Sequence, residues 1–364
     1  MTKYLIFSLY LISFLVVFLF FIIIVYHRIQ NQKKKKLNEL KNEYYPIIED
    51  YMNNKINMKE TEHKLKNELN YETMMELFKP LFKKYTERNI NKLQALIKQT
   101  GLNDYYLEKL NSNNKKKKLK AASILGILEE NRALDKLYQM LNSKDELVII
   151  TTAWAISETG NMDNLNNIIN SLFNKTDMTY EAITELLVNF NKKICDKLIN
   201  YINQYLANTN YFKSHFAVKD YKLLALFIDI FGFFRYKKSL TTMKKLLKRN
   251  PHEEVIIHIL KSLVKISEPI EIDLTKYLLH KNWVIKSQTA KYISKINNSN
   301  YLEILRKLLT DENWWVKYYA AKAIWNLGEI ELMIDIIIKD KPGANICDYI
   351  LAENNYNYIL EERK

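Results

Sequence analysis

The stretch "DENWWVKYYAAKAIWNLGE", residues 311–329, decides the fold, because its pattern already occurs 31 residues earlier. The segments "NWVIKSQTAKYISKI" (282–296) and "NWWVKYYAAKAIWNL" (313–327) align without a gap. Equivalent positions carry residues of the same kind: Ile285 and Val316, Lys286 and Lys317, Ala290 and Ala321, Ile296 and Leu327. A self-similar period of this length predicts stacked copies of one structural unit.

Earlier parts of the chain carry further copies of the pattern. "LVIITTAWAISETG" (147–160) has the same internal spacing, and weaker copies lie at 118–130 and 253–266. A leucine-rich segment with helical spacing follows each copy or separates it from the next, as in "YLEILRKLLTDEN". Repeated pairs of antiparallel helices are typical of an α-solenoid.

The last copy resembles a HEAT repeat of the armadillo-like class through Asp311, Val316, Lys317, Ala320, Ala321, Leu327 and Gly328. The resemblance extends over roughly residues 112–340 and is weakest between 175 and 250. It implies an all-α fold, a right-handed α-solenoid of HEAT-like helical pairs. It also implies that Asp311 and Lys317 stabilise the turn between the two helices of the last pair.

Composition agrees with long helices. The 364 residues include only 6 Gly and 5 Pro, and turns draw heavily on both. Two cysteines in so long a chain favour a reducing compartment over a disulfide framework. The net charge of +14 is spread over many lysine-rich segments, so attraction to an anionic membrane explains it as well as nucleic acid does.

Residues 4–26, "YLIFSLYLISFLVVFLFFIIIVY", contain no charge. As a helix they span roughly 35 Å, enough to cross a hydrocarbon core of about 30 Å. The alternative, a cleaved signal peptide, would have a shorter apolar core and a small-residue cleavage site. We therefore expect an uncleaved transmembrane helix.

Basic residues follow this segment: Arg28 and the run Lys33, Lys34, Lys35 and Lys36. By the positive-inside rule, residues 27–364 are expected in the cytoplasm and residues 1–3 outside a plasma membrane crossed once. The run is interpreted as a membrane-flanking, stop-transfer signal. A specific role in binding acidic lipid is the alternative.

The expected organisation is a short tail (1–3), a transmembrane helix (4–26), a basic segment with a helical stalk and cap (27–110), HEAT-like repeats (111–340) and a C-terminal capping helix (341–364). Within it, Pro46 and Pro80 are expected to end or kink helices. The run "NSNNKKKK" (111–118) is interpreted as a solvated turn, and the apolar stretch 220–236 as a buried inner helix.

Trp283, Lys286, Trp314, Trp315 and Lys317 are the candidate partner-binding residues. Tryptophan beside a basic residue is typical of binding hot spots. The alternative is that the indole rings cover the turn between two helices. Trp325 and the alanines at 320, 321 and 323 are instead expected to pack neighbouring helices closely together.

The sequence carries no pattern of catalytic or cofactor-binding residues. His252 and His258 lack the spacing that puts two zinc ligands on one helix face, and no glycine-rich phosphate loop or nucleophile motif occurs. We therefore expect neither an enzyme nor a cofactor or metal. The expected function is a membrane-anchored cytoplasmic scaffold that binds a membrane-associated protein, for instance in an envelope-polysaccharide glycosyltransferase or secretion machine.

The alternative is a nucleic-acid-binding protein related to HEAT-like DNA alkylation-repair glycosylases, although a membrane anchor suits such a protein poorly. We predict that a fragment of residues 37–364 shows no salt-sensitive binding to DNA or RNA in a mobility-shift assay at low salt. Tight binding that weakens steeply with added salt would contradict the scaffold interpretation.

Overall fold

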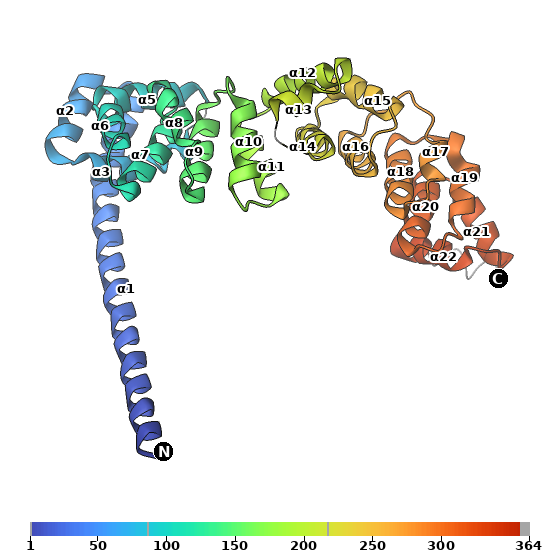
Figure 1. Ribbon diagram of the computed structural model, residues 1–364, viewed down its shortest axis with the longest axis horizontal. Coiled ribbons are helices and arrows are strands. Elements are labelled where there is room, and N and C mark those ends of the chain that lie inside the picture. The colour runs from blue at the N-terminus through green and yellow to red at the C-terminus, as the bar shows by residue number, and fades with distance from the viewer. Residues whose placement is uncertain (1, 86, 217, 357–364) are drawn as a thin grey trace. The chain divides into compact units, whose positions relative to one another are not determined.

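The computed structural model describes residues 2–85, 87–216 and 218–356, and within these ranges the regular structure is entirely helical (Figure 1). The all-α expectation is confirmed. The chain divides into two compact units, unit 1 (Met1–Glu130) and unit 2 (Asn131–Lys364). Residues 357–364, the end of the expected capping helix, lie outside the described part of the chain, as does Met1 of the expected tail.

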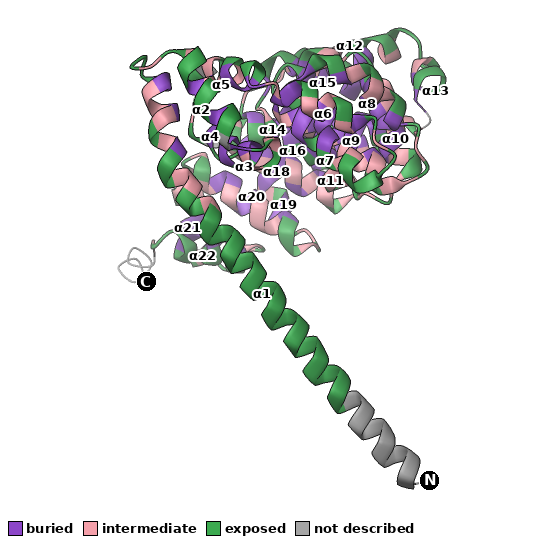
Figure 2. Ribbon diagram, turned by 90° about the vertical axis from the view of Figure 1, so that its left-hand side faces the viewer, coloured by how far each residue is buried: buried purple, intermediate pink, exposed green. Residues whose placement is uncertain are grey.

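Helix α1 (Thr2–Met52) carries the apolar segment. An 18-residue window within Ser13–Met52 has a mean hydropathy of 2.0, and none of that window is buried. In the described part of the chain, this is the one helix long and apolar enough to cross a membrane. Figure 2 shows the projecting part of α1 as exposed wherever its burial is described, from residue 13 onward.

The same helix continues into the core of unit 1. Pro46 lies inside α1 and does not end it, because α1 continues to Met52. The proline ring is exposed, whereas Tyr44, Ile48 and Tyr51 are buried. Packing against α2, α3 and α5 therefore holds this part of α1 helical despite the missing N–H group.

Short helices complete unit 1: α2 (Met58–Glu68), α3 (Tyr71–Phe78), α4 (Leu81–Lys84), α5 (Glu87–Gln99), α6 (Leu102–Leu110) and α7 (Lys115–Ile127). Pro80 lies between α3 and α4 as expected. The expected turn at 111–118 is shorter in the structure. The Asn114 side chain accepts a hydrogen bond from the Lys117 N–H, so the lysine run forms the first turn of α7.

Unit 2 is a series of helical pairs. Its helices are α8 (Leu134–Met140), α9 (Glu146–Thr159), α10 (Leu165–Lys175), α11 (Tyr180–Val188), α12 (Ile194–Ala207), α13 (Tyr211–His215), α14 (Asp220–Phe233), α15 (Leu240–Lys248), α16 (Glu253–Ile266), α17 (Thr275–Leu278), α18 (Trp283–Ile296), α19 (Leu302–Leu308), α20 (Trp314–Asn326), α21 (Ile330–Ile338) and α22 (Ala344–Glu353). The second helices of successive pairs, α14, α16, α18, α20 and α22, contact one another in order. They begin about thirty residues apart, which accounts for the period in the sequence.

Small residues let these second helices approach closely. In α20, Val316, Ala320, Ala321 and Ala323 are buried against neighbouring helices. Between α14 and α16 the approach is closest at Gly232, where an added Cβ would lie 2.5 Å from the Ser262 Oγ atom and 3.0 Å from its Cα atom. These contacts leave no room for larger side chains.

The weak period between 175 and 250 has a structural cause. The short helix α13 is inserted between α12 and α14, and its Phe212, with Phe216 just after it, packs onto Tyr201 and Phe227. This insertion lengthens one repeat. The expectation of a buried inner helix at 220–236 is confirmed, because α14 buries most of its residues, from Leu223 to Gly232.

We predict that Gly232→Ala lowers the free energy of unfolding by about 1–3 kcal/mol, because the new methyl group overlaps Ser262. Helix propensity alone would give the opposite sign, since alanine is the better helix former. Thermal unfolding of the purified protein distinguishes the two. Adding Ser262→Gly should restore part of the loss, and a more stable Gly232→Ala variant would contradict the close approach.

Candidate functional site

The repeated tryptophans stand at the starts of two neighbouring second helices. Asn282 and Asn313 cap α18 and α20, their side chains accepting hydrogen bonds from the Val284 and Trp315 N–H groups. Trp283 and Trp314 are therefore the first helical residues. This position projects side chains towards solvent, and the exposed fractions are 43% for Trp283 and 44% for Trp314.

The structure shows which residue pairs with Asp311, a point that the HEAT resemblance left open. Its carboxylate pairs with Lys286 of the preceding second helix, not with Lys317, and also accepts the Asn313 N–H. The exposed fractions of the two side chains are 18% for Lys286 and 10% for Asp311. The pair thus links one repeat to the next, and Lys286 is committed to this link.

Five aromatic side chains from the start of α20 and from α22 cluster together, and we call them the aromatic patch: Trp314, Trp315, Tyr318, Tyr319 and Tyr349. The Trp314 ring stacks on Tyr318 with centroids 5.1 Å apart and meets Trp315 edge-on at 4.8 Å. Tyr349 of α22 meets Trp314 edge-on at 6.0 Å. Trp283 is not among the ring partners of this patch in the described structure.

Polar contacts hold the patch in place. The Tyr318 hydroxyl hydrogen-bonds to Glu353, 3.1 Å from Oε1, and Lys322 Nζ donates to both Tyr318 and Glu353. These bonds raise the pKa of Lys322, through Tyr318 first and then Glu353, and they lower the pKa of Glu353. Lys291 Nζ lies 5.0 Å from the centre of the Tyr319 ring. These contacts link Tyr318 to Lys322 and Glu353, and Tyr319 to Lys291.

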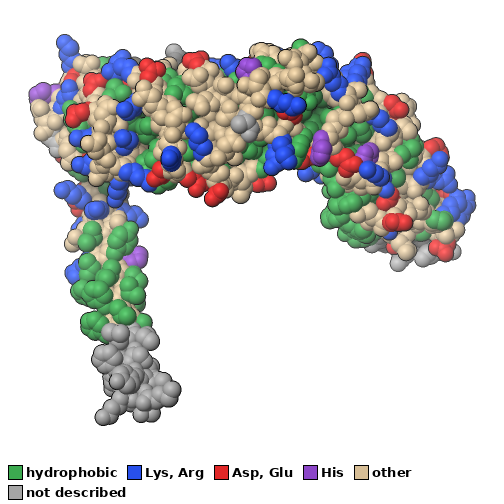
Figure 3. All heavy atoms as spheres, in the orientation of Figure 1, with side chains coloured by type: hydrophobic (Ala, Val, Ile, Leu, Met, Phe, Trp, Pro, Cys, Tyr) green, Lys and Arg blue, Asp and Glu red, His purple; other side chains and the backbone are tan. Residues whose placement is uncertain are grey.

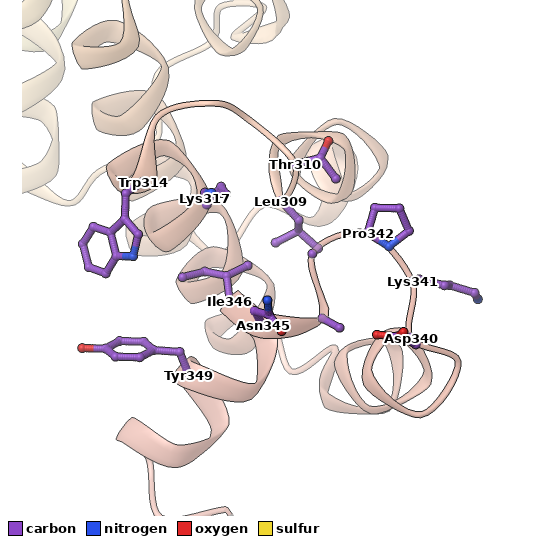
Figure 4. Close-up of a pocket in the computed structure, with 12 residues that line it drawn as sticks. Leu309, Thr310, Trp314, Lys317, Asp340, Lys341, Pro342, Asn345, Ile346 and Tyr349 are labelled. Carbon is purple, nitrogen blue, oxygen red and sulfur yellow. The ribbon is translucent and has the colours of Figure 1, made fainter.

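A cavity of about 550 Å³ adjoins the patch. Trp314 and Tyr349 form one side of it, and the segment 340–343 closes the other side (Figure 4). Lys317 also lines it and has no ion pair within the described residues. Leu309 and Ile346 supply apolar surface.

The shape of this cavity depends on Gly343. This residue precedes α22 at φ +97°, a conformation that favours glycine, and a Cβ atom here would lie 2.7 Å from Leu309 Cβ. No side chain caps α22, and within the described chain the Asn345 and Ile346 N–H groups have no hydrogen-bond partner. The cavity therefore combines aromatic walls, one lysine and a helix N-terminus, which suit an apolar group joined to a negative charge.

The two histidines singled out in the sequence lie in separate surroundings. His252 stacks on Tyr221 and caps α16, whereas His258 Nδ1 lies 2.8 Å from Asp229, which also accepts a hydrogen bond from Tyr180. Among the described residues no group of three or more His, Cys, Asp or Glu is placed to hold a metal ion. Burial raises the pKa of each of the two cysteine thiols to about 12.

Sequence reasoning found Trp314, Trp315 and Lys317 but missed the tyrosines. Tyr318 and Tyr319 fall one helical turn after the tryptophans, so their spacing already placed them on the same face. Tyr349 is contributed by the next helical pair and carries no local signal. Trp325 is half-buried and contacts Tyr356 beyond α22, with ring centroids 5.2 Å apart.

The fold defines an all-helical chain of stacked helical pairs that carries one helix apolar enough to cross a membrane. No family model matches the sequence, and no curated protein matches it. Among solved structures it is similar to the crystal structure of an engineered protein from the Northeast Structural Genomics Consortium, with 16% identity and a TM-score of 0.35 over 84% of this chain and 92% of that one. A similarity at this level assigns neither family nor function.

We predict that Lys286→Ala destabilises unit 2 by about 1–3 kcal/mol, because it leaves the largely buried Asp311 carboxylate without its counter-charge. The matched variant Lys317→Ala, at the equivalent position one repeat later, should change stability by less than about 0.5 kcal/mol. Denaturant unfolding of the two variants measures the difference. Equal losses would contradict the assignment of the ion pair.

Proposed function

We propose that this chain is a membrane-anchored scaffold that docks a protein partner on the aromatic patch and the adjoining cavity of unit 2. Its helical pairs are of HEAT type and form a right-handed solenoid. The apolar part of α1 crosses the membrane, with the rest of the chain in the cytoplasm. The aromatic patch is the observation that carries this proposal.

The residue types and their order favour protein binding. Tryptophan and tyrosine dominate binding hot spots, and a rigid aromatic side chain loses little conformational entropy on binding. The hydrogen bonds among Tyr318, Lys322 and Glu353 reduce that cost further, because they fix the patch in advance. Trp314, Trp315 and Tyr349 are each more than two-fifths exposed, a poor arrangement for residues with no partner.

The cavity favours one kind of partner segment. An aromatic or aliphatic side chain would fill the space between Trp314 and Ile346, and a neighbouring carboxylate would pair with Lys317 and with the free N–H groups at the start of α22. The net charge of +14 also favours an acidic partner surface. The expected segment therefore carries an apolar residue next to Asp, Glu or a C-terminal carboxylate.

Anchoring increases the effect of a weak docking site. A partner confined to the same membrane meets the site at a raised effective concentration, so modest affinity suffices. The partner is for this reason expected to be membrane-associated, as a subunit of an envelope-polysaccharide glycosyltransferase or a secretion machine would be.

We predict that a photo-activated cross-linking amino acid at Tyr349 captures one protein in intact cells. The same amino acid at Phe233, an equally exposed aromatic position on α14 outside the patch, should not capture it. Combining Trp314→Ala with the cross-linker at Tyr349 should abolish the product, whereas combining Lys322→Gln with it should only weaken the product. The readout is the mass and yield of the cross-linked product.

A product captured equally from Phe233, or unaffected by Trp314→Ala, would contradict docking at the patch. A product that contains nucleic acid instead of protein would favour the alternative function. Protein that is released from membranes by alkaline extraction would contradict the anchoring, independently of the patch.

A further inference from the structure

A second cavity, of about 640 Å³, lies in unit 1 beside the part of α1 that follows the apolar segment. Three of the lysines that line it, Lys33, Lys34 and Lys36, come from α1, and a fourth, Lys120, comes from α7. Glu72 and Glu76 of α3 line it as well. We call this cavity the basic groove. Figure 3 shows lysine and arginine side chains gathered where α1 enters unit 1.

With the apolar segment of α1 in the hydrocarbon core, the groove lies at the level of the lipid headgroups. Lys33 follows Tyr26, the last residue of the uncharged stretch, by seven positions on the same continuous helix, which is roughly 10 Å along the axis. The headgroup layer extends roughly 5–8 Å beyond the hydrocarbon core on each side, and long lysine side chains reach several ångströms towards it. Lys33 and Lys34 thus reach lipid phosphates without unwinding α1.

The spacing of the lining residues along α1 distinguishes the basic groove from an ordinary stop-transfer run of charged residues. Gln30, Lys33, Lys34, Leu37 and Leu40 recur at three- and four-residue spacing, so one face of α1 lines the cavity. Lys35, in the middle of the run, does not line it. A stop-transfer signal needs only charge and would make no such distinction.

The fourth lysine is brought in by the fold. Lys120 is far from the α1 run in sequence, yet it lines the same groove, and its Nζ atom lies 3.6 Å from a Glu72 carboxylate oxygen. This contact orients Lys120 and leaves the ammonium group exposed. To enclose a phosphate group, basic side chains must approach it from more than one direction, and Lys120 supplies the second direction from a separate helix.

The charge of the groove sets the class of ligand. Four lysines against two glutamates leave a net charge of +2, which matches a phosphodiester monoanion with charge to spare. The carboxylates and the Thr73 hydroxyl can accept hydrogen bonds from ligand hydroxyl groups. A phosphate flanked by hydroxyls is the headgroup chemistry of a phosphatidylglycerol-type lipid.

We propose that the basic groove binds the phosphate headgroup of an anionic glycerophospholipid at the cytoplasmic surface of the membrane. The proposal rests on the membrane crossing by α1 in the proposed function, and it adds a lipid site independent of the protein-docking patch in unit 2. Bound lipid holds unit 1 against the bilayer through two helices, α1 and α7.

The test uses the full-length chain in nanodiscs of phosphatidylcholine with 0 to about 30% phosphatidylglycerol, a range chosen to span the anionic content that such sites meet. Native mass spectrometry counts the phosphatidylglycerol molecules that remain bound after release. The compared variants are Lys34→Gln and Lys120→Gln in the groove, with Lys35→Gln and Lys116→Gln as controls that remove one exposed lysine outside it.

We expect each groove variant to lower the apparent affinity for phosphatidylglycerol about fivefold, and each control to lower it less than about twofold. Since all four lysines are exposed or solvated, the thermal stability of each variant in pure phosphatidylcholine should match that of the parent chain.

Three results would overturn the proposal. Equal losses for groove and control variants would show a general polybasic attraction. Inorganic phosphate at millimolar concentration that displaces the lipid fully would identify a soluble phosphate as the ligand. Equal retention of phosphatidylglycerol and phosphatidylcholine would exclude headgroup recognition. Failure of the chain to enter nanodiscs at all would instead contradict the anchoring in the proposed function.

Discussion

Close approach between successive second helices is the constraint on which unit 2 depends. Gly232 against Ser262, and the alanines of α20 against α18, let helices stack at a distance that larger side chains would prevent. The stacking fixes the spacing of the helix starts, and with it the positions of whatever the first helical residues project. The ion pair between Lys286 and Asp311 adds a directional link across one of these contacts. Trp283 and Trp314 therefore occupy equivalent positions in neighbouring repeats.

The repeat can be predicted from the sequence because the residues that define it are close together along the chain. A helix, its cap and its small-residue face all lie within fifteen residues, so "NWWVKYYAAKAIWNL" contains nearly everything that defines α20. The asparagine before each tryptophan carries the cap and is a further local signal of the helix start. The family resemblance gave Asp311 and Lys317 a role in stabilising the turn before α20 but named no partner for Asp311. The structure joins Asp311 to the preceding copy.

Features whose residues come from distant segments could not be predicted from local sequence patterns. Tyr349 completes the aromatic patch from the next helical pair, and Lys120 completes the basic groove from α7, and neither residue stands out in its own sequence context. Pro46 is a further case in which the local sequence does not determine the structure. Its local preference is to break a helix, but burial of Tyr44, Ile48 and Tyr51 outweighs that preference. Where the intrinsic preference of a residue and its tertiary packing disagree, the packing determines the local structure.

The continuity of α1 has a mechanical consequence. One uninterrupted helix contains the apolar segment, the lysine run and the buried residues Tyr44, Ile48, Tyr51 and Met52 of unit 1, with no loop between them. Each residue advances the helix by about 100° of rotation. With the apolar part of α1 crossing the membrane as proposed, the count of residues along α1 sets which face of unit 1 meets the bilayer. In that arrangement, a change in the tilt or rotation of the apolar segment would pass to unit 1 through an unbroken helix. Membrane thickness, which influences the tilt of a spanning helix, would in that arrangement act on unit 1 directly.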